Sequence, residues 1–212
     1  MAGDFLGVGH HRVWHFGELF TVPESIQPER RNAEPLARAF SAYPGLAIDR
    51  RLMAYAGAIG FFYAGVFAYI SSSSFAFITY HQLSPLAYGV IFSVGIVGVV
   101  LANVVNSRLM TKLGGDRMLL FGAIGAGVFG AIVAVVTLTD AGGYWLLALA
   151  LWLFVAMNGF INANAVSGAL AYFPQRAGAV SALLGAVQYG SGVFGSAIAG
   201  AAADGTPRPM GW

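Results

Sequence analysis

The chain has 212 residues, of which 58% are hydrophobic and only 9% charged, and its mean hydropathy is +0.71. An ordinary soluble domain carries roughly 25% charged residues, so this composition excludes that class. The net charge of only +2 argues against nucleic acid as a partner, and the absence of cysteine excludes disulfides, thiolate metal ligands and thiol catalysis.

The N-terminal residues 1–21 show no apolar periodicity, and we interpret them as a disordered segment unrelated to the rest of the chain. They contain three histidines, His10, His11 and His15. No carboxylate or cysteine completes a recognisable ligand spacing around them, so we expect no metal site.

Residues 22–51 are polar and rich in arginine, and we interpret them as a cytoplasmic loop. Within the loop, Asn32 can cap a helix and Pro35 suits its first turn. Apolar residues follow at helical spacing, which predicts a short amphipathic helix along the membrane face.

Five long segments without Asp, Glu, Lys or Arg follow this loop. Each has the roughly 20 residues that a helix needs to cross a bilayer core about 30 Å thick. A helix also satisfies its own backbone hydrogen bonds in hydrocarbon. We therefore predict an all-α membrane protein with five transmembrane helices over residues 52–203 and a short outer tail over 204–212. The segments are Leu52–Thr79, Pro85–Asn106, Met118–Thr139, Tyr144–Leu170 and Ala177–Ala203.

Basic residues are distributed unequally between the two sides of these helices. Ten of the eleven Lys and Arg residues lie before the first segment, between the second and third, or between the fourth and fifth. The positive-inside rule places these regions in the cytoplasm. We therefore expect a multi-pass protein of the cytoplasmic (inner) membrane, with a cytoplasmic N-terminus and an outer C-terminus.

Two stretches match the dinucleotide-binding pattern G-x-G-x-x-G, at residues 125–130 and 190–195. Both lie inside charge-free segments, without the preceding strand and downstream acid that nucleotide binding requires. We reject a nucleotide site and expect no cofactor. Small residues spaced four apart instead predict close packing of helix backbones, at Gly122, Ala126 and Gly130 and at Gly192, Ser196 and Gly200.

Uncharged polar side chains within the segments are the candidates for a substrate cavity. An amide in hydrocarbon costs free energy unless it finds a partner or faces water. The alternative role is an interhelical hydrogen bond, worth about 0.6 kcal/mol on average. Two of the three asparagines in the fourth segment share a helix face and the third points elsewhere, which suits a cavity wall better than lipid. The candidates are Tyr69, Asn158, Asn162, Asn164 and Gln188.

No segment contains a carboxylate, lysine, arginine or histidine in its apolar run, apart from His81 at an outer loop. Proton-coupled transport normally needs a titratable group within the membrane, so the sequence argues against such transport by this chain alone. The same absence argues against a membrane-embedded enzyme.

Several motifs resemble the Bcr/CflA drug-resistance branch of the major facilitator superfamily. FPQRAGAVSALLGAVQYG (Phe173–Gly190) resembles that branch's junction between the tenth and eleventh helices, and FAYISSSSF (Phe67–Phe75) resembles its seventh helix. LSPLAYGVIFSVGIVG, followed by NSRLMTKLGGDRMLL, resembles its eighth helix and the next basic loop. VPESIQPERR (Val22–Arg31) resembles the loop after its sixth helix, so the resemblance runs from about Val22 to Gly211.

The resemblance implies that the chain is a partial C-terminal half of a major facilitator fold, holding helices seven to eleven of twelve. It places Asn164 and Gln188 at polar positions of the family's cavity helices. Ser74 stands where a proline is usual and Gly95 where an asparagine is usual. The family's drug/proton antiport relies on an acidic residue in its first helix, which is absent here.

The loop between the second and third segments resembles a degenerate copy of the superfamily's gating loop. The residues that correspond to it are Arg108, Lys112, Asp116 and Arg117. The resemblance implies that its cations steady the cytoplasmic ends of the helices. Ordinary anchoring of a membrane protein by basic residues is the alternative interpretation.

We interpret the chain as a partial drug/proton antiporter, or multidrug efflux permease, that is not transport-competent alone. Its partners would be the lipid bilayer and, when paired with an N-terminal half, hydrophobic drug-like small molecules. One alternative is a half-transporter that assembles with itself or another half. A second alternative is a non-transporting membrane scaffold that binds a partner through its small-residue helix faces.

Overall fold

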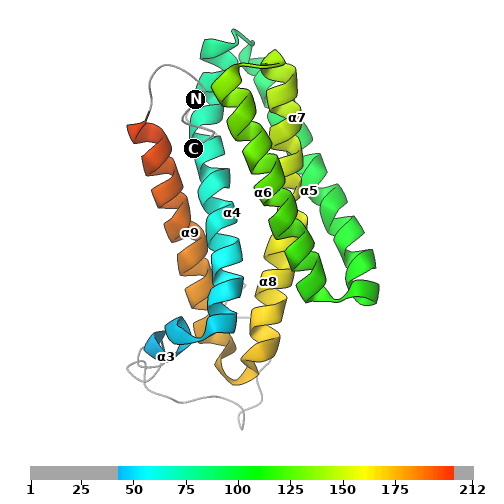
Figure 1. The fold of residues 1–212 in the computed structure, drawn as a ribbon, viewed down its shortest axis with the longest axis vertical. Coiled ribbons are helices and arrows are strands. Elements are labelled where there is room, and N and C mark those ends of the chain that lie inside the picture. Colours follow the sequence, from blue (N-terminus) through cyan, green and yellow to red (C-terminus); the bar gives the residue numbers. More distant parts are fainter. Residues whose placement is uncertain (1–42, 203–212) are drawn as a thin grey trace, which may run out of the picture. The chain divides into compact units, whose positions relative to one another are not determined.

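The computed structural model describes residues 43–202, which form a bundle of helices joined by short connections (Figure 1). No strand occurs within this range. The segment 1–21, the amphipathic helix expected after Asn32 and the tail 204–212 lie outside the described residues. In chain order the elements are α3 (Tyr43–Ile48), α4 (Arg50–Ser74), η2 (Phe75–Tyr80), α5 (Pro85–Leu113), α6 (Gly115–Thr139), α7 (Gly143–Ala156), α8 (Asn158–Tyr172), η3 (Pro174–Arg176) and α9 (Ala177–Ala201).

Five helical stretches in this range are long and apolar enough to cross a membrane, so the five-helix prediction is confirmed. The helices extend beyond the charge-free segments at their charged ends. For example, α5 continues past Asn106 to Leu113, where Gly114 with a φ of 85° ends it. Charged residues limit the length of the part of a helix that crosses hydrocarbon. The helix itself continues until a residue such as a glycine with positive φ ends it. The five stretches are Arg50–Tyr80, Pro85–Leu113, Gly115–Thr139, Gly143–Tyr172 and Pro174–Ala201.

The first two membrane helices begin at capping residues that the sequence shows directly. The Oδ1 atom of Asp49 accepts hydrogen bonds from the backbone N–H groups of Arg51 and Leu52, at 2.9 and 3.0 Å. The hydroxyl of Ser84 accepts one from the backbone N–H at the third residue of α5, and proline fills the first position of that helix. Such side chains satisfy donors that a helix leaves free at its start.

Two of the predicted continuous helices are irregular. The first membrane stretch ends in a π-helical turn, η2, with Ala76 and Phe77 fully buried in it. The fourth is divided at Met157, where backbone bonds three residues apart replace the regular ladder and separate α7 from α8. Such breaks depend on packing: a Cβ at Gly159 would lie only 2.6 Å from the backbone nitrogen of Asn103 on α5. Sequence periodicity carries no signal of this contact.

Helix α9 packs along α4, in the most extensive contact between two elements of the described bundle, and Figure 1 shows the two side by side. Their backbones approach closely at Gly195, where a Cβ would overlap the carbonyl group of Ala64. The hydroxyl of Ser196 donates to the Phe67 carbonyl at 3.4 Å. The prediction of a close approach at Gly192 and Ser196 is therefore confirmed, but the prediction for Gly200 is wrong. That residue is exposed, and Gly195 takes its place.

Helices α5 and α6 pack instead against the α7–α8 pair. The small residues expected on α6 form this contact: Gly122 lies against Phe160 and Ile161, and Ala126 is buried in the same apolar cluster. The indole Nε1 of Trp152 on α7 donates to the Val94 carbonyl of α5 at 2.9 Å. Two glycine-rich stretches that match the nucleotide pattern thus lie within α6 and α9, where they serve packing.

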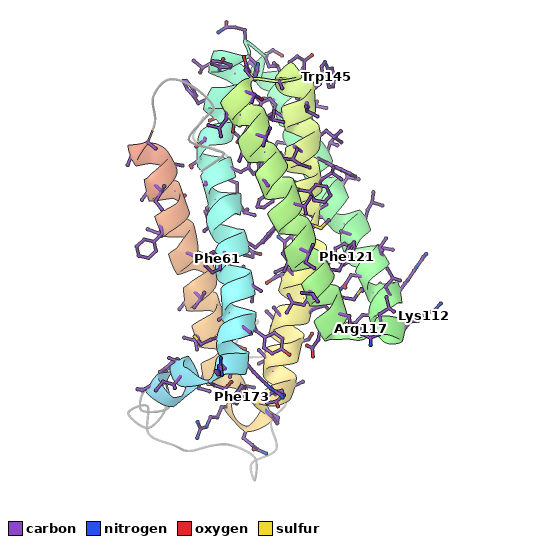
Figure 2. All side chains as sticks on the ribbon, in the orientation of Figure 1. Phe61, Lys112, Arg117, Phe121, Trp145 and Phe173 are labelled. Carbon is purple, nitrogen blue, oxygen red and sulfur yellow. The ribbon has the colours of Figure 1, made fainter. Side chains whose placement is uncertain are left out.

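The outer faces of the bundle are apolar, as a lipid-facing surface requires. Phe61 on α4 is 87% exposed and Phe194 on α9 is 72% exposed. Exposed valines, leucines and isoleucines run the length of α5 and α6. Figure 2 shows these side chains projecting from the ribbon, with Phe61 and Phe121 labelled. In water such a surface would aggregate, so it agrees with the membrane assignment.

Candidate functional site

The three asparagines of α8 have different surroundings. Asn158 is half-buried, and its Nδ2 atom donates a long hydrogen bond of 3.5 Å to the Tyr63 hydroxyl of α4. Asn162 is also half-buried, and its Oδ1 atom is enclosed without a hydrogen-bond partner. Asn158 and Asn162 lie one turn apart, as their spacing predicts. They remain candidates for the substrate cavity, and that role stays a prediction.

Asn164 has a role in helix packing that is visible in the structure. Its side chain is 1% exposed, and its Nδ2 atom donates to Asn106 Oδ1 of α5 and to the carbonyl of Phe160, both at 2.7 Å. This interhelical hydrogen bond is the alternative that the sequence left open for any single asparagine. Sequence reasoning missed Asn106 as a partner, although it stands at the end of a charge-free segment, where a polar residue can signal contact with a neighbouring helix.

Tyr69 and Gln188 are not joined to the α8 asparagines. Tyr69 is buried, and its ring stacks on Phe92 of α5 with centroids 6.1 Å apart. It lines a small cavity of about 10 Å³ together with Phe77 and Trp152. This volume is about that of one water molecule. Gln188 is half-buried on α9; its backbone carbonyl accepts a hydrogen bond from the Ser191 hydroxyl at 3.0 Å, and its side-chain amide has no hydrogen bond within residues 43–202.

An apolar hollow on the described surface lies between α4 and α9. It is open, has a volume of about 290 Å³ and is lined mainly by small and aromatic side chains. A drug-binding site normally adds a few placed polar groups to an apolar wall. This groove offers one hydroxyl, from Ser191, so its shape suits an acyl chain or another apolar helix better than a polar drug. The lining residues are Gly57, Gly60, Phe61, Ala64, Val187, Ser191 and Phe194.

The residues of the expected gating loop meet at the turn from α5 to α6. Arg108 and Lys112 lie in the last turns of α5, and Asp116 and Arg117 lie in the first turn of α6; all four are exposed. Figure 2 shows Lys112 and Arg117 near this turn. The structure shows no ion pair among these four residues. The Asp116 carboxylate instead accepts a hydrogen bond of 2.8 Å from the Tyr55 hydroxyl of α4.

Cations and anions at this turn suit the helix ends that carry them. Lys112 stands at the C-terminus of α5, where the helix dipole favours positive charge, and Asp116 stands at the N-terminus of α6, where it favours negative charge. Within the described range, no group of three or more His, Cys, Asp or Glu side chains could hold a metal ion. The histidines His10, His11 and His15 lie outside that range.

Comparison with known proteins agrees with this architecture of long apolar helices joined by a basic loop. The family model described as "Major Facilitator Superfamily" matches residues 16–203, and the chain therefore belongs to this superfamily of membrane transporters. It is 30% identical over 196 residues to the bicyclomycin resistance protein homolog of Haemophilus influenzae. That alignment covers 91% of this chain and 48% of the relative, so the chain spans about half the relative's length. The resemblance to the Bcr/CflA branch is thereby confirmed.

Proposed function

We propose that the chain is five helices of the C-terminal half of a drug/proton antiporter, a multidrug efflux permease of the cytoplasmic membrane. The observation that carries this proposal is the alignment of nearly the whole chain with about half of a protein named for bicyclomycin resistance. The five-span architecture and the family motifs from Val22 onward support it. Hydrophobic drug-like small molecules are the substrate class that this kinship favours.

The proposed unit does not transport by itself. Alternating access in such folds uses two halves that rock around a site near the bilayer midplane. Proton coupling also needs a group that changes charge within the membrane. The apolar runs of the five membrane helices contain only neutral side chains, so a second half would have to supply that group. By the same reasoning, the chain has no enzymatic role of its own.

The distribution of charge supports a cytoplasmic N-terminus. All six lysines and arginines among residues 43–202 lie at the start of α4, at the α5–α6 turn or just before α9. The opposite connections, η2 to α5 and α6 to α7, carry Asp140 and His81 but no lysine or arginine. This inequality favours the cytoplasm for the basic end.

Two other functions have some support. The buried Asn106–Asn164 pair shows that at least one intramembrane amide joins helices, as a scaffold that binds a partner without transport would also require. The open apolar groove between α4 and α9 would suit association with a second copy or another half-transporter. Transport in partnership remains the better explanation because the relative is a resistance protein.

Dye efflux tests the proposal directly. Residues 1–212 would be produced in a bacterial strain lacking its own drug pumps, and accumulation of a fluorescent cationic dye would be followed with and without a protonophore. We expect no efflux above the empty-vector control, because the apolar runs of the membrane helices contain no Asp, Glu, His, Lys or Arg side chain to couple transport to protons. The complete Haemophilus relative, produced in the same strain, provides the positive control.

Two results would contradict the proposal in different ways. Efflux by residues 1–212 that a protonophore abolishes would show an active transporter assembled from copies of this chain. In a second test, the part of the relative that does not align with this chain would be produced beside it as a separate polypeptide. Failure of that polypeptide to co-purify with this chain would favour the scaffold.

A further inference from the structure

Polar side chains from two neighbouring helices approach the first two residues of α6. Gly115 and Asp116 open this helix, and no side chain within the described residues caps its free backbone N–H groups. From α4, the Tyr55 hydroxyl donates to Asp116 Oδ1 at 2.8 Å. From α8, the Asn164 Oδ1 atom is enclosed without a donor and would lie 3.5 Å from a Cβ placed on Gly115. Helices α4 and α8 thus both reach the start of α6.

Tyr55 can reach Asp116 because α8 leaves room for its ring. A Cβ on Gly168 of α8 would lie 2.9 Å from two ring carbons of Tyr55 and 3.0 Å from its hydroxyl oxygen. The aromatic ring therefore lies against the backbone of α8 at a residue without a side chain. One turn earlier on α4, the Arg51 guanidinium lies over the Tyr172 ring of α8, 4.4 Å from its centroid. The start of α4 thus contacts both α8 and α6.

We infer that Tyr55 is a positioning residue for the gating loop, holding the first turn of α6 through Asp116. This hydrogen bond connects α4 to the turn that carries Lys112 and Arg117, so a shift of α4 at this end would either break the bond or move the loop. Only the name "gating loop" depends on the proposed function. The contacts and their test concern this chain alone, so failure of the efflux experiment leaves the inference intact.

Amide hydrogen exchange of the detergent-solubilised full chain tests the inference. In Tyr55→Phe, which removes only the hydroxyl, peptides covering residues 114–121 should exchange about 2- to 10-fold faster, the range expected for one hydrogen bond. Peptides covering the start of α9 should not change. The matched control is Tyr172→Phe at the same end of the bundle, since the Tyr172 hydroxyl has no hydrogen bond within the described residues. A purely structural defect would instead accelerate exchange throughout the bundle.

Double variants make the test specific for the pair. Asp116→Ala should accelerate the same peptides as Tyr55→Phe does, and the double variant should add little, because both changes break one hydrogen bond. Asp116→Asn keeps an acceptor oxygen and should restore most of the protection. Gly168→Ala should also accelerate these peptides, because its Cβ would displace the Tyr55 ring from Asp116. Unchanged exchange in Tyr55→Phe, or additive effects of Tyr55→Phe and Asp116→Ala, would overturn the inference.

Discussion

Asn164 shows that a polar side chain whose sequence pattern favours a cavity can also join two membrane helices. Its spacing from the two other asparagines and its family position both favour a substrate site. In the structure it is enclosed and bonded to Asn106. A one-dimensional pattern identifies a helix face but not the neighbour of that face. The candidate residues could therefore be found from sequence, but the Asn106–Asn164 pair could not.

Substitution of this asparagine should measure the value of the pair. In Asn164→Ala the Oδ1 atom of Asn106 loses its donor, and we expect a loss of roughly 0.6–1.7 kcal/mol, the range for interhelical hydrogen bonds in membranes. The readout is the midpoint of detergent-induced unfolding in mixed micelles. Asn103→Ala on α5 is the control, because Asn103 is exposed and bonds only to the Val99 carbonyl of its own helix. Equal losses in both variants would show that the pair has no special role.

Accessibility distinguishes the remaining cavity candidates. The native chain has no cysteine, so single substitutions can be labelled without background. We expect a membrane-impermeant thiol reagent to label Gln188→Cys faster than Asn164→Cys, because Gln188 is half-buried and Asn164 is enclosed. Val128→Cys on α6 should stay unlabelled, because its 51% exposure is to lipid. If Gln188→Cys were as protected as Val128→Cys, a packing role would be favoured for Gln188.

At the scale of elements, the charge-free segments predicted the membrane helices because a bilayer imposes length and composition directly. The interruptions at η2 and Met157 were not predicted. They depend on how a helix meets its neighbours, as at Gly159 against the α5 backbone. Small-residue spacing found two of the three residues predicted for the α4–α9 contact. It chose Gly200 in place of Gly195, because the two glycines look alike in sequence and only Gly195 faces α4.

The α4–α9 contact leads to a prediction about Gly195. Any side chain at this position would overlap the backbone of Ala64, so Gly195→Ala should force the two helices apart. We expect destabilisation of about 1–3 kcal/mol, the usual cost of overpacking. Gly190→Ala on the same helix is the control, since a Cβ there meets no atom within 4 Å. Thermal unfolding of the purified protein in detergent measures both variants. Similar unfolding temperatures for the two would contradict the close approach.

At the scale of the whole molecule, the five spans and the unequal charges of their two ends define a topology that can be tested. The basic start of α4, the α5–α6 turn and Arg176 belong to one end, and His81 and Asp140 to the other. A lysine or arginine at the centre of a membrane helix costs about 2.5–3.5 kcal/mol on insertion scales, so these residues stay at the helix ends. The positive-inside rule places the basic end in the cytoplasm.

Reporter fusions should therefore alternate along the chain. A reporter active only in the cytoplasm should be active when fused after Gly114 or Arg176 and inactive after His81, Asp140 or Trp212. A periplasmic reporter at the same positions should give the opposite pattern and serves as the control for expression. Reducing the charge bias, by replacing Arg108, Lys112 and Arg117 with glutamine, should weaken the preference at Gly114. A cytoplasmic signal at Trp212 would mean that one of the five apolar stretches does not span the membrane, because an odd number of crossings must place the two ends of the chain on opposite sides.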